Sequence, residues 1–397
     1  VSPPLALYVH VPWCVRKCPY CDFNSHEANG GIPERQYVDA LIADLQSALP
    51  LIWGRPVASV FFGGGTPSLL SPAAIDELVA AFRALAMLSP EAEITLEANP
   101  GTVEAEKFAG FRAAGINRLS LGIQSFNDDH LAALGRIHGA SEARRAAQLA
   151  GEHFASFNLD LMYGLPGQTL ADLEDTLKQA IELAPSRIAL FGYAHLPDLV
   201  PRQRRIDANA LPGSELRFEM AALGHALLAK AGYQPIGFDH FALASDGLAK
   251  ANAKGKLYRN FQGFTDDDSP VLLGFGASAI SSFPHVMIQN EKNPGKYREC
   301  IASGTLASTR GVRRSDDDRS RSAIIEHILC QREARDIPEE IVASARTKLG
   351  PLEALGLIEW DERDLRLSRG ALPYARIVAA AFDAYRQPGS SQFSNAI

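Results

Sequence analysis

The strongest constraint on the fold is a regular alternation of short apolar runs and helix-like stretches between residues 5 and 212. The apolar runs are rich in β-branched and aromatic residues, as strands are, and the stretches between them are rich in Ala, Leu, Glu and Arg. The six strand-like runs are residues 5–11, 57–64, 92–100, 118–126, 155–164 and 187–196. The helix-like stretches are residues 33–49, 71–85, 104–115, 127–135, 140–151 and 169–184. This pattern predicts an α/β fold of repeated βα units around a parallel sheet.

Polar or glycine-rich residues follow each of the six predicted strands. In parallel α/β folds the carboxyl ends of the strands form the functional face. The residues concerned are Cys14 to Cys21, Gly63 to Thr66, Glu97, Gln124, Asp160 and Tyr193 to His195. A fold without a function has no need of polar residues at every strand end, so we expect the active site there.

The rest of the chain has a different pattern. Residues 214–310 open with a helical stretch and continue into the glycine-rich "LLGFGASAISSF". Residues 311–397 are mostly helical, with "LGLIEWDERDLRLSRG" resembling a small hairpin between helices, as in winged-helix modules. We therefore expect three regions, 1–213, 214–310 and 311–397, with a loose tail "RQPGSSQFSNAI".

Composition excludes several classes of protein. A net charge of −7 argues against sequence-independent nucleic-acid binding. No apolar run approaches the about 18 residues that span a bilayer, and the N-terminus lacks the layout of a signal peptide. Five cysteines, three of them clustered, do not fit a disulfide framework, so a reducing cytoplasm is the expected compartment. The isolated Cys300 and Cys330 are expected to be buried or partly buried thiols.

Three cysteines in the spacing C-x3-C-x2-C follow the first predicted strand. They are Cys14, Cys18 and Cys21. Phe23 lies two residues after the last of them, so no fourth cysteine ligand is near. Structural zinc sites use four ligands, usually from two C-x2-C pairs, and no second pair exists. A [4Fe–4S] cluster held by three thiolates keeps one iron without a protein ligand, able to bind substrate or cofactor. We favour the cluster over a three-thiolate zinc site or an accidental grouping.

This spacing after the first strand, with Tyr20 before the last cysteine, resembles the radical S-adenosylmethionine (SAM) superfamily. The resemblance implies a partial (β/α)6 barrel in residues 1–213, with a mostly helical C-terminal extension. It also implies that SAM chelates the open iron and is cleaved to a 5′-deoxyadenosyl radical, with one or two SAM molecules bound.

The resemblance assigns cofactor contacts to residues at the strand ends. The turn Gly63, Gly64, Gly65 and Thr66 corresponds to the loop that contacts the SAM amino group. Glu97 suits the ammonium, Arg136 the carboxylate, and Gln124 and Asp160 the ribose hydroxyls. Further expected cofactor-binding residues are Tyr8, Ala194, Gly274, Gly276 and Ala279.

Longer motifs resemble one family within the superfamily, which comprises the oxygen-independent coproporphyrinogen III oxidases and the related haem chaperones. The N-terminal half, with "CPYCDFNS" and "LGRIHGASEARRAAQLA", is more similar to the chaperones. The second half, with "FGYAHLPDLVPRQRRI", "GYQPIGFDHFAL" and the terminal "QFSNAI", is more similar to the oxidases. Because substrate-facing residues fall mainly in the second half, we favour the oxidase.

The oxidase resemblance implies oxidative decarboxylation of two propionates of coproporphyrinogen III to vinyl groups in haem biosynthesis. Tyr8, His10, Asp239 and His240 are the expected catalytic residues. Expected carboxylate clamps are Arg202, Arg204, Arg205 and Arg259. An electron donor such as flavodoxin or ferredoxin is the expected partner. The alternatives are a haem chaperone, a haem-modifying radical enzyme and a non-catalytic Fe–S protein.

Overall fold

The structure is a computed structural model that describes residues 2–102 and 104–386. It divides into two compact units. Unit 1 comprises the described residues of Val1–Leu161 together with Glu182–Pro185 and Asp267–Arg314. Unit 2 comprises Met162–Ile181, Ser186–Asp266 and the described residues of Ser315–Ile397. These units cut across the three ranges expected from the sequence, and that division into functional regions stays a prediction.

Unit 1 is built on a sheet with the strand order β16-β15-β14-β13-β1-β4-β5-β6-β7. The strands from β13 through β1 to β7 are all parallel to their neighbours, whereas β14, β15 and β16 are antiparallel additions. Their bounds are β1 Leu5–Val11, β4 Pro56–Gly64, β5 Met87–Ala98, β6 Arg118–Gln124, β7 Ser156–Tyr163, β13 Val271–Phe275, β14 Ile280–Ser282, β15 Val286–Asn290 and β16 Ser308–Arg313. Every residue of β1 is buried, as expected for a central parallel strand.

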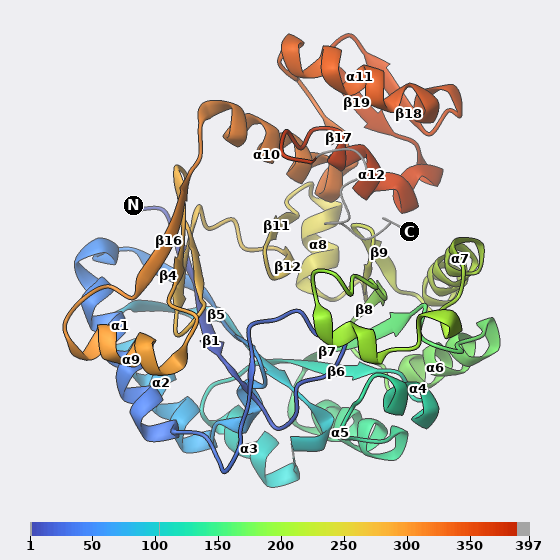
Figure 1. Cartoon of the computed structure of the whole chain (residues 1–397). Coiled ribbons are helices and arrows are strands. Elements are labelled where there is room, and N and C mark those ends of the chain that lie inside the picture. The colour runs from blue at the N-terminus through green and yellow to red at the C-terminus, as the bar shows by residue number, and fades with distance from the viewer. Residues whose placement is uncertain (1, 103, 387–397) are drawn as a thin grey trace. The chain divides into compact units, whose positions relative to one another are not determined.

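Helices follow the strands of unit 1 in sequence and cover one face of its sheet (Figure 1). They are α1 Glu34–Ile52, α2 Pro72–Leu85, α3 Ala105–Ala113, α4 Asp128–Ala133, α5 Ala140–His153 and α9 Pro294–Ala302. Local sequence explains where several begin. The Ser71 side chain accepts a hydrogen bond from the Ala74 amide at the start of α2, and Asn127 caps α4 in the same way.

Unit 2 begins at the carboxyl end of β7 and contains a second set of strands. Strands β8 Arg187–Gly192, β10 His240–Ala242 and β9 Gln234–Ile236 pair antiparallel in that order. Strands β11 Tyr258–Asn260 and β12 Gly263–Thr265 form a hairpin. The helices are α6 Leu170–Glu182, α7 Ser214–Lys230, α8 Gly247–Ala253, α10 Asp316–Gln331, α11 Glu339–Ala354 and α12 Ala375–Ala380.

The C-terminal part of unit 2 is helical with a small sheet, and it shares one hydrophobic core with the middle of the chain. Strands β18 Ile358–Asp361 and β19 Asp364–Leu367 form the predicted hairpin, and β17 Glu333–Ala334 pairs with β19. The core combines residues of 236–264 with residues of 324–382. The winged-helix likeness stays a prediction.

The predicted order of strands and helices is confirmed in both units, with β5 beginning five residues earlier than expected. The described helices include none with the length and apolar character of a membrane crossing. The end of the predicted tail, residues 387–397 with "QFSNAI", lies outside the described residues.

Candidate active site

The cysteine loop follows β1 and is closed by short backbone pairings. Strands β2 Trp13–Cys14 and β3 His26–Glu27 pair in parallel, and the Ala28 amide donates to the carbonyl of Cys14 at 2.8 Å. The Lys17 ammonium donates to the carbonyls of Phe23 and Ser25 at 2.8 and 3.2 Å. Hydrogen bonds to backbone carbonyls within the loop therefore hold its conformation.

The three thiols stand at different depths in this loop. Cys18 is buried, and Cys14 and Cys21 are partly exposed. Among the described residues, no group of His, Cys, Asp or Glu side chains is placed to hold a single metal ion. Thiolates of a [4Fe–4S] cluster bind different irons and need not converge on one point. Three thiols in one loop therefore fit a cluster better than a single ion. The Phe23 side chain is 59% exposed and does not reach the interior.

Arg136 connects this loop to the end of β6. Its Nη1 donates to Cys18 Sγ at 3.7 Å and to Tyr20 Oη at 3.2 Å, and its Nη2 donates to the Gly122 carbonyl. Its Nε is buried and has no hydrogen-bond partner. Two of its three nitrogens are thus engaged with protein, and Nε is the donor that remains for a ligand carboxylate. Gln124, which ends the same strand, has a positive φ of 70°, a strained conformation for a non-glycine residue of the kind that clusters at functional sites.

The glycine turn at the end of β4 packs tightly against β1 and the cysteine loop. A Cβ on Gly64 would lie 2.6 Å from the His10 ring, and one on Gly65 would lie 2.5 Å from the Trp13 carbonyl oxygen. On Gly63 it would meet the rings of Phe61 and Tyr8 at 2.9 and 3.0 Å. The sequence predicts that these glycines allow a ligand to approach the backbone closely. The structure adds a second reason, which is close packing of neighbouring protein segments.

Thr66, which ends the turn, is buried, and its amide donates to the Trp13 carbonyl at 2.7 Å. The turn and the cysteine loop are therefore joined by backbone hydrogen bonds. A movement of one of these segments would displace the other.

Glu97, on β5, is a carboxyl group without an ion-pair partner among the described residues. Its Oε2 accepts a hydrogen bond from the Gly64 amide at 3.1 Å. Burial and, next, the charge of Asp160 raise the pKa of Glu97 to about 8, against the opposing effects of the Gly64 amide and Arg118. Burial disfavours the charged form of Glu97, and a cationic ligand beside the carboxyl group would stabilise that form. This fits the ammonium expected there.

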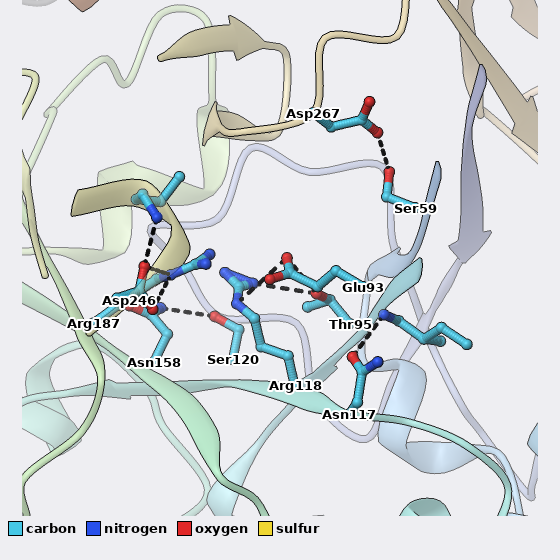
Figure 2. A network of polar contacts seen from close by, with 12 residues as sticks. Ser59, Glu93, Thr95, Asn117, Arg118, Ser120, Asn158, Arg187, Asp246 and Asp267 are labelled. Carbon is cyan, nitrogen blue, oxygen red and sulfur yellow. Dashed lines mark hydrogen bonds and ion pairs between the residues drawn. The ribbon is translucent and has the colours of Figure 1, made fainter. Parts of the chain in front are cut away.

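Asp160, on β7, is oriented by two polar neighbours. The Ser120 hydroxyl donates to its Oδ2 at 3.1 Å, and Asn158 Nδ2 donates to its Oδ1 at 2.7 Å. Figure 2 shows that Asn158 and Ser120 also contact each other, at 2.9 Å. Its place at a strand end marks the aspartate in the sequence, whereas no local signal marks Ser120 or Asn158.

A second polar group in Figure 2 lies on β5 and β6. Arg118 Nη1 donates to the Thr95 hydroxyl at 3.2 Å, and Arg118 Nε lies 3.7 Å from Glu93. Arg118 also lowers the pKa of Glu97, although burial and Asp160 outweigh it, so this arginine favours the charged form of the carboxyl group.

Tyr8 and His10 form a short chain of hydrogen bonds from β1 to the cysteine loop. His10 Nε2 donates to the Asn24 carbonyl at 2.9 Å, so its Nδ1 accepts from the Tyr8 hydroxyl, also at 2.9 Å. Burial lowers the pKa of His10 to about 4, which keeps the imidazole neutral at pH 7. Both of its nitrogens are occupied. Its catalytic role stays a prediction, and the geometry supports a role in holding the loop.

Gly274, Gly276 and Ala279 lie against β1. Gly274 pairs with Tyr8 in the sheet, and Ala279 packs in the same small cluster as Tyr8. A Cβ on Gly276 would lie 2.6 Å from the His10 carbonyl oxygen, and one on Gly274 would lie 2.5 Å from the Ile280 carbonyl oxygen. Protein atoms therefore occupy the space beside both glycines, and second-ligand binding at this segment stays a prediction.

Unit 2 contains the remaining predicted residues. His240 Nδ1 lies 2.6 Å from Asp239 Oδ1, so the predicted pair is in contact. The carbonyl of Ala194 accepts from Gln203 Nε2 at 3.0 Å. The side chains of Arg202, Arg204 and Arg205 are exposed on a 3-10 turn, Pro201–Arg205.

Unit 2 contains two candidate functional residues that the sequence does not mark, Arg217 on α7 and Arg376 on α12. Each is a lone arginine in a helix with no motif around it, so no local signal marked it. Their neighbours become apparent only in the folded chain.

Comparison with known proteins agrees with this geometry. Residues 8–180 match the model of the Radical SAM superfamily. The chain is 39% identical over 403 residues to the oxygen-independent coproporphyrinogen III oxidase of Bradyrhizobium diazoefficiens, covering 99% of this chain and 89% of that one. It is 42% identical over 315 residues to the haem chaperone HemW of Escherichia coli, covering 79% of this chain and 80% of that one.

A solved structure also matches. It is coproporphyrinogen III oxidase (HemN) from Escherichia coli, described as a radical SAM enzyme, with a TM-score of 0.90 at 35% identity, over 97% of this chain and 91% of that one. This match confirms the predicted α/β fold, a partial barrel whose sheet is not closed and whose C-terminal part is helical. Radical SAM proteins bind a [4Fe–4S] cluster and SAM, and the thiols, the Glu97 carboxyl group and the free Nε of Arg136 fit these two groups. The chain therefore belongs to the radical SAM superfamily, in the family shared by oxygen-independent coproporphyrinogen III oxidases and HemW haem chaperones.

Proposed function

We propose that this protein is an oxygen-independent coproporphyrinogen III oxidase, which forms protoporphyrinogen IX in haem biosynthesis. One observation carries the proposal, namely how far along the chain the similarity to each relative extends. Oxidases of three organisms match 97% to 99% of this chain. The chaperones of Escherichia coli and Haemophilus influenzae match 79% and 71% of it. Oxidase-like sequence thus continues through residues that the chaperone matches leave out.

The second candidate is a haem chaperone, and a different observation favours it. Over the shorter matched length the identity to the chaperones is 42% to 45%, above the 35% to 39% found for the oxidases. We give coverage more weight, because the oxidase matches extend over nearly the whole chain and the chaperone matches do not.

The cofactors would be held by residues at the strand ends of unit 1. Cys14, Cys18 and Cys21 would bind the cluster. Glu97 and the Nε of Arg136 would take the ammonium and carboxylate of SAM. When bound, these groups supply a 5′-deoxyadenosyl radical that abstracts hydrogen atoms.

The reaction removes one hydrogen atom, one CO2 and one electron from each of two propionates and forms a vinyl group. An electron acceptor takes the last electron. Asp239 would fix the tautomer of His240 by accepting from its Nδ1, which keeps Nε2 available for a proton or for the substrate. Buried Tyr8 and His10 would hold the cysteine loop in register with β1.

The partners follow from this chemistry. The substrate is a tetrapyrrole, and an electron donor such as flavodoxin or ferredoxin would reduce the cluster. None of the five cysteines, all of which lie within the described residues, forms a disulfide, which supports a reducing compartment such as the cytoplasm.

An anaerobic turnover assay tests the proposal. Protein with a reconstituted cluster is given SAM, a reductant, an electron acceptor and coproporphyrinogen III, and CO2 and product mass are followed. We expect loss of one and then two CO2 per substrate, abolished in Cys18→Ala. Cys300→Ala is the matched control, because it removes a partly exposed thiol outside the cysteine loop. SAM cleavage without decarboxylation, together with stoichiometric retention of haem, would move the protein to the chaperone group.

A further inference from the structure

Three arginine side chains in the described part of unit 2 have no ion-pair partner. Among the described residues, no carboxylate lies within ion-pair distance of the guanidinium groups of Arg217, Arg259 or Arg376, and Glu326 accepts only from the backbone amide of Arg259, at 3.0 Å. In the same unit Arg187 lies 2.7 Å from Asp246 and Arg321 lies 2.7 Å from Asp317. An arginine side chain that has no counter-ion within the protein is well suited to bind an anionic ligand.

Arg259 and Arg376 are placed against the same aromatic side chain. The Arg259 guanidinium lies 5.8 Å from the centroid of Phe238 and 5.7 Å from that of Phe264. The Arg376 guanidinium lies 5.5 Å from the centroid of Phe238. The two phenylalanine rings are 5.6 Å apart and nearly perpendicular. Charged donors and apolar ring faces thus alternate within one patch.

Arg217 joins this patch through Tyr163, the last residue of β7. A Cβ on Gly164, the next residue, would lie 3.4 Å from Arg217 Nε, and that Nε is buried without a hydrogen-bond partner. Burial raises the pKa of Tyr163, and the charges of Arg217 and Arg376 act against this rise. The charges of both guanidiniums therefore act on the same hydroxyl group.

The patch lies at the carboxyl ends of β7 and β8. The Tyr193 amide, just beyond β8, donates to the Tyr163 carbonyl at 2.9 Å. Two acidic groups are nearby, Asp239, which is engaged by His240, and Glu326, which accepts from the Arg259 backbone amide at 3.0 Å. His240 packs its ring edge-on against Phe264, with centroids 5.5 Å apart. The predicted catalytic pair therefore contacts the patch through Phe264.

We propose that Arg217, Arg259 and Arg376, with Phe238 and Phe264, form the subsite that binds the propionates of the tetrapyrrole. We call these five residues the arginine–phenylalanine cluster. The identity of the ligand rests on the proposed function. Its chemistry, an apolar ring system carrying several carboxylates, matches alternating guanidiniums and phenyl rings. Because Arg376 lies on α12, the C-terminal extension contributes directly to substrate binding.

Binding of coproporphyrin III tests this subsite without relying on turnover. This stable, fluorescent, oxidised form of the substrate keeps all four carboxylates. Anaerobically purified protein with its cluster is titrated with coproporphyrin III and, separately, with its tetramethyl ester. We expect Arg217→Gln and Arg376→Gln to raise the Kd for the acid about tenfold or more, and to leave the Kd for the ester unchanged.

Two further variants make the result interpretable. Arg346→Gln is the matched control, because that guanidinium also lies over an aromatic ring of unit 2, 5.1 Å from the centroid of Trp360. It should bind like the wild type. Arg376→Lys keeps the charge and should recover part of the affinity. The thermal unfolding of each variant shows whether it is folded.

Two outcomes would overturn the subsite. One is a folded Arg217→Gln or Arg376→Gln protein that binds the acid as the wild type does. The other is a wild type that binds the ester as tightly as the acid. If decarboxylation is nevertheless observed, only the subsite fails and the oxidase stands. A wild type that neither binds coproporphyrin III nor releases CO2 overturns both proposals.

Discussion

The buried carboxyl group of Glu97 makes the stability of the fold depend on pH. Its pKa is raised to about 8 from an ordinary value of 4.5, first by burial and then by Asp160. Between these values the folded chain keeps a proton that the unfolded chain releases. The contribution of Glu97 to stability is therefore highest below about pH 4.5 and declines as the pH rises to 8, by up to about 1.4 kcal/mol per pH unit. Other groups facing this carboxyl are Arg118, Tyr8 and the Gly64 amide.

We predict that Glu97→Gln removes this part of the pH dependence. Urea unfolding measured without SAM from pH 5 to 8 should show a flatter profile for the variant, because its amide does not titrate. Glu91→Gln, an exposed glutamate on the same strand, is the control and should retain the wild-type profile. An unchanged profile in Glu97→Gln would contradict the assignment of the raised pKa to this carboxyl.

At the scale of single elements, the turn before β10 depends on a glycine. Gly237 has a positive φ of 59°, and a Cβ there would lie 1.9 Å from the Phe264 ring. Phe264, on β12, is part of the arginine–phenylalanine cluster. Its ring occupies the space that a side chain at position 237 would need.

We predict that Gly237→Ala destabilises the protein by about 2–4 kcal/mol, since backbone strain and displacement of the ring add together. Gly255→Ala is the matched control. That glycine also has a positive φ, of 65°, but nothing lies within 4 Å of its would-be Cβ. Its cost should be about 1 kcal/mol. Chemical denaturation measures both, and equal losses would show that the contact with Phe264 adds nothing.

At the scale of the whole molecule, the C-terminal residues complete a hydrophobic core. Ile236, Leu257 and Phe264 share that core with Ile328 and Phe382. The C-terminal part of unit 2 is therefore a structural component of the unit that contains the predicted catalytic pair, and removing it exposes apolar surface.

We predict that a chain ending at Arg314 binds the dye ANS strongly and is cleaved rapidly by protease within residues 236–264. A chain ending at Arg386 keeps every residue of this core and should resist both. Equal protection of the two chains would show that the middle of unit 2 folds without its C-terminal part.

Much of the fold was predictable because its signals are local. Strand and helix patterns depend on residues close together in sequence, and parallel strands necessarily bring their carboxyl ends to one edge. The cysteine spacing, the polar strand ends and the adjacent Asp239 and His240 could therefore be identified from the sequence.

The sequence by itself determined the order of elements and the residues at the strand ends, because both depend on short-range periodicity. Only the tertiary structure decided which distant residues meet. Arg217 and Arg376 lie about 160 positions apart yet act on the same tyrosine. The glycines of the β4 turn are required by the side chains and backbone of β1 and the cysteine loop. Such contacts arise from packing between segments far apart in the chain, and no local pattern encodes them.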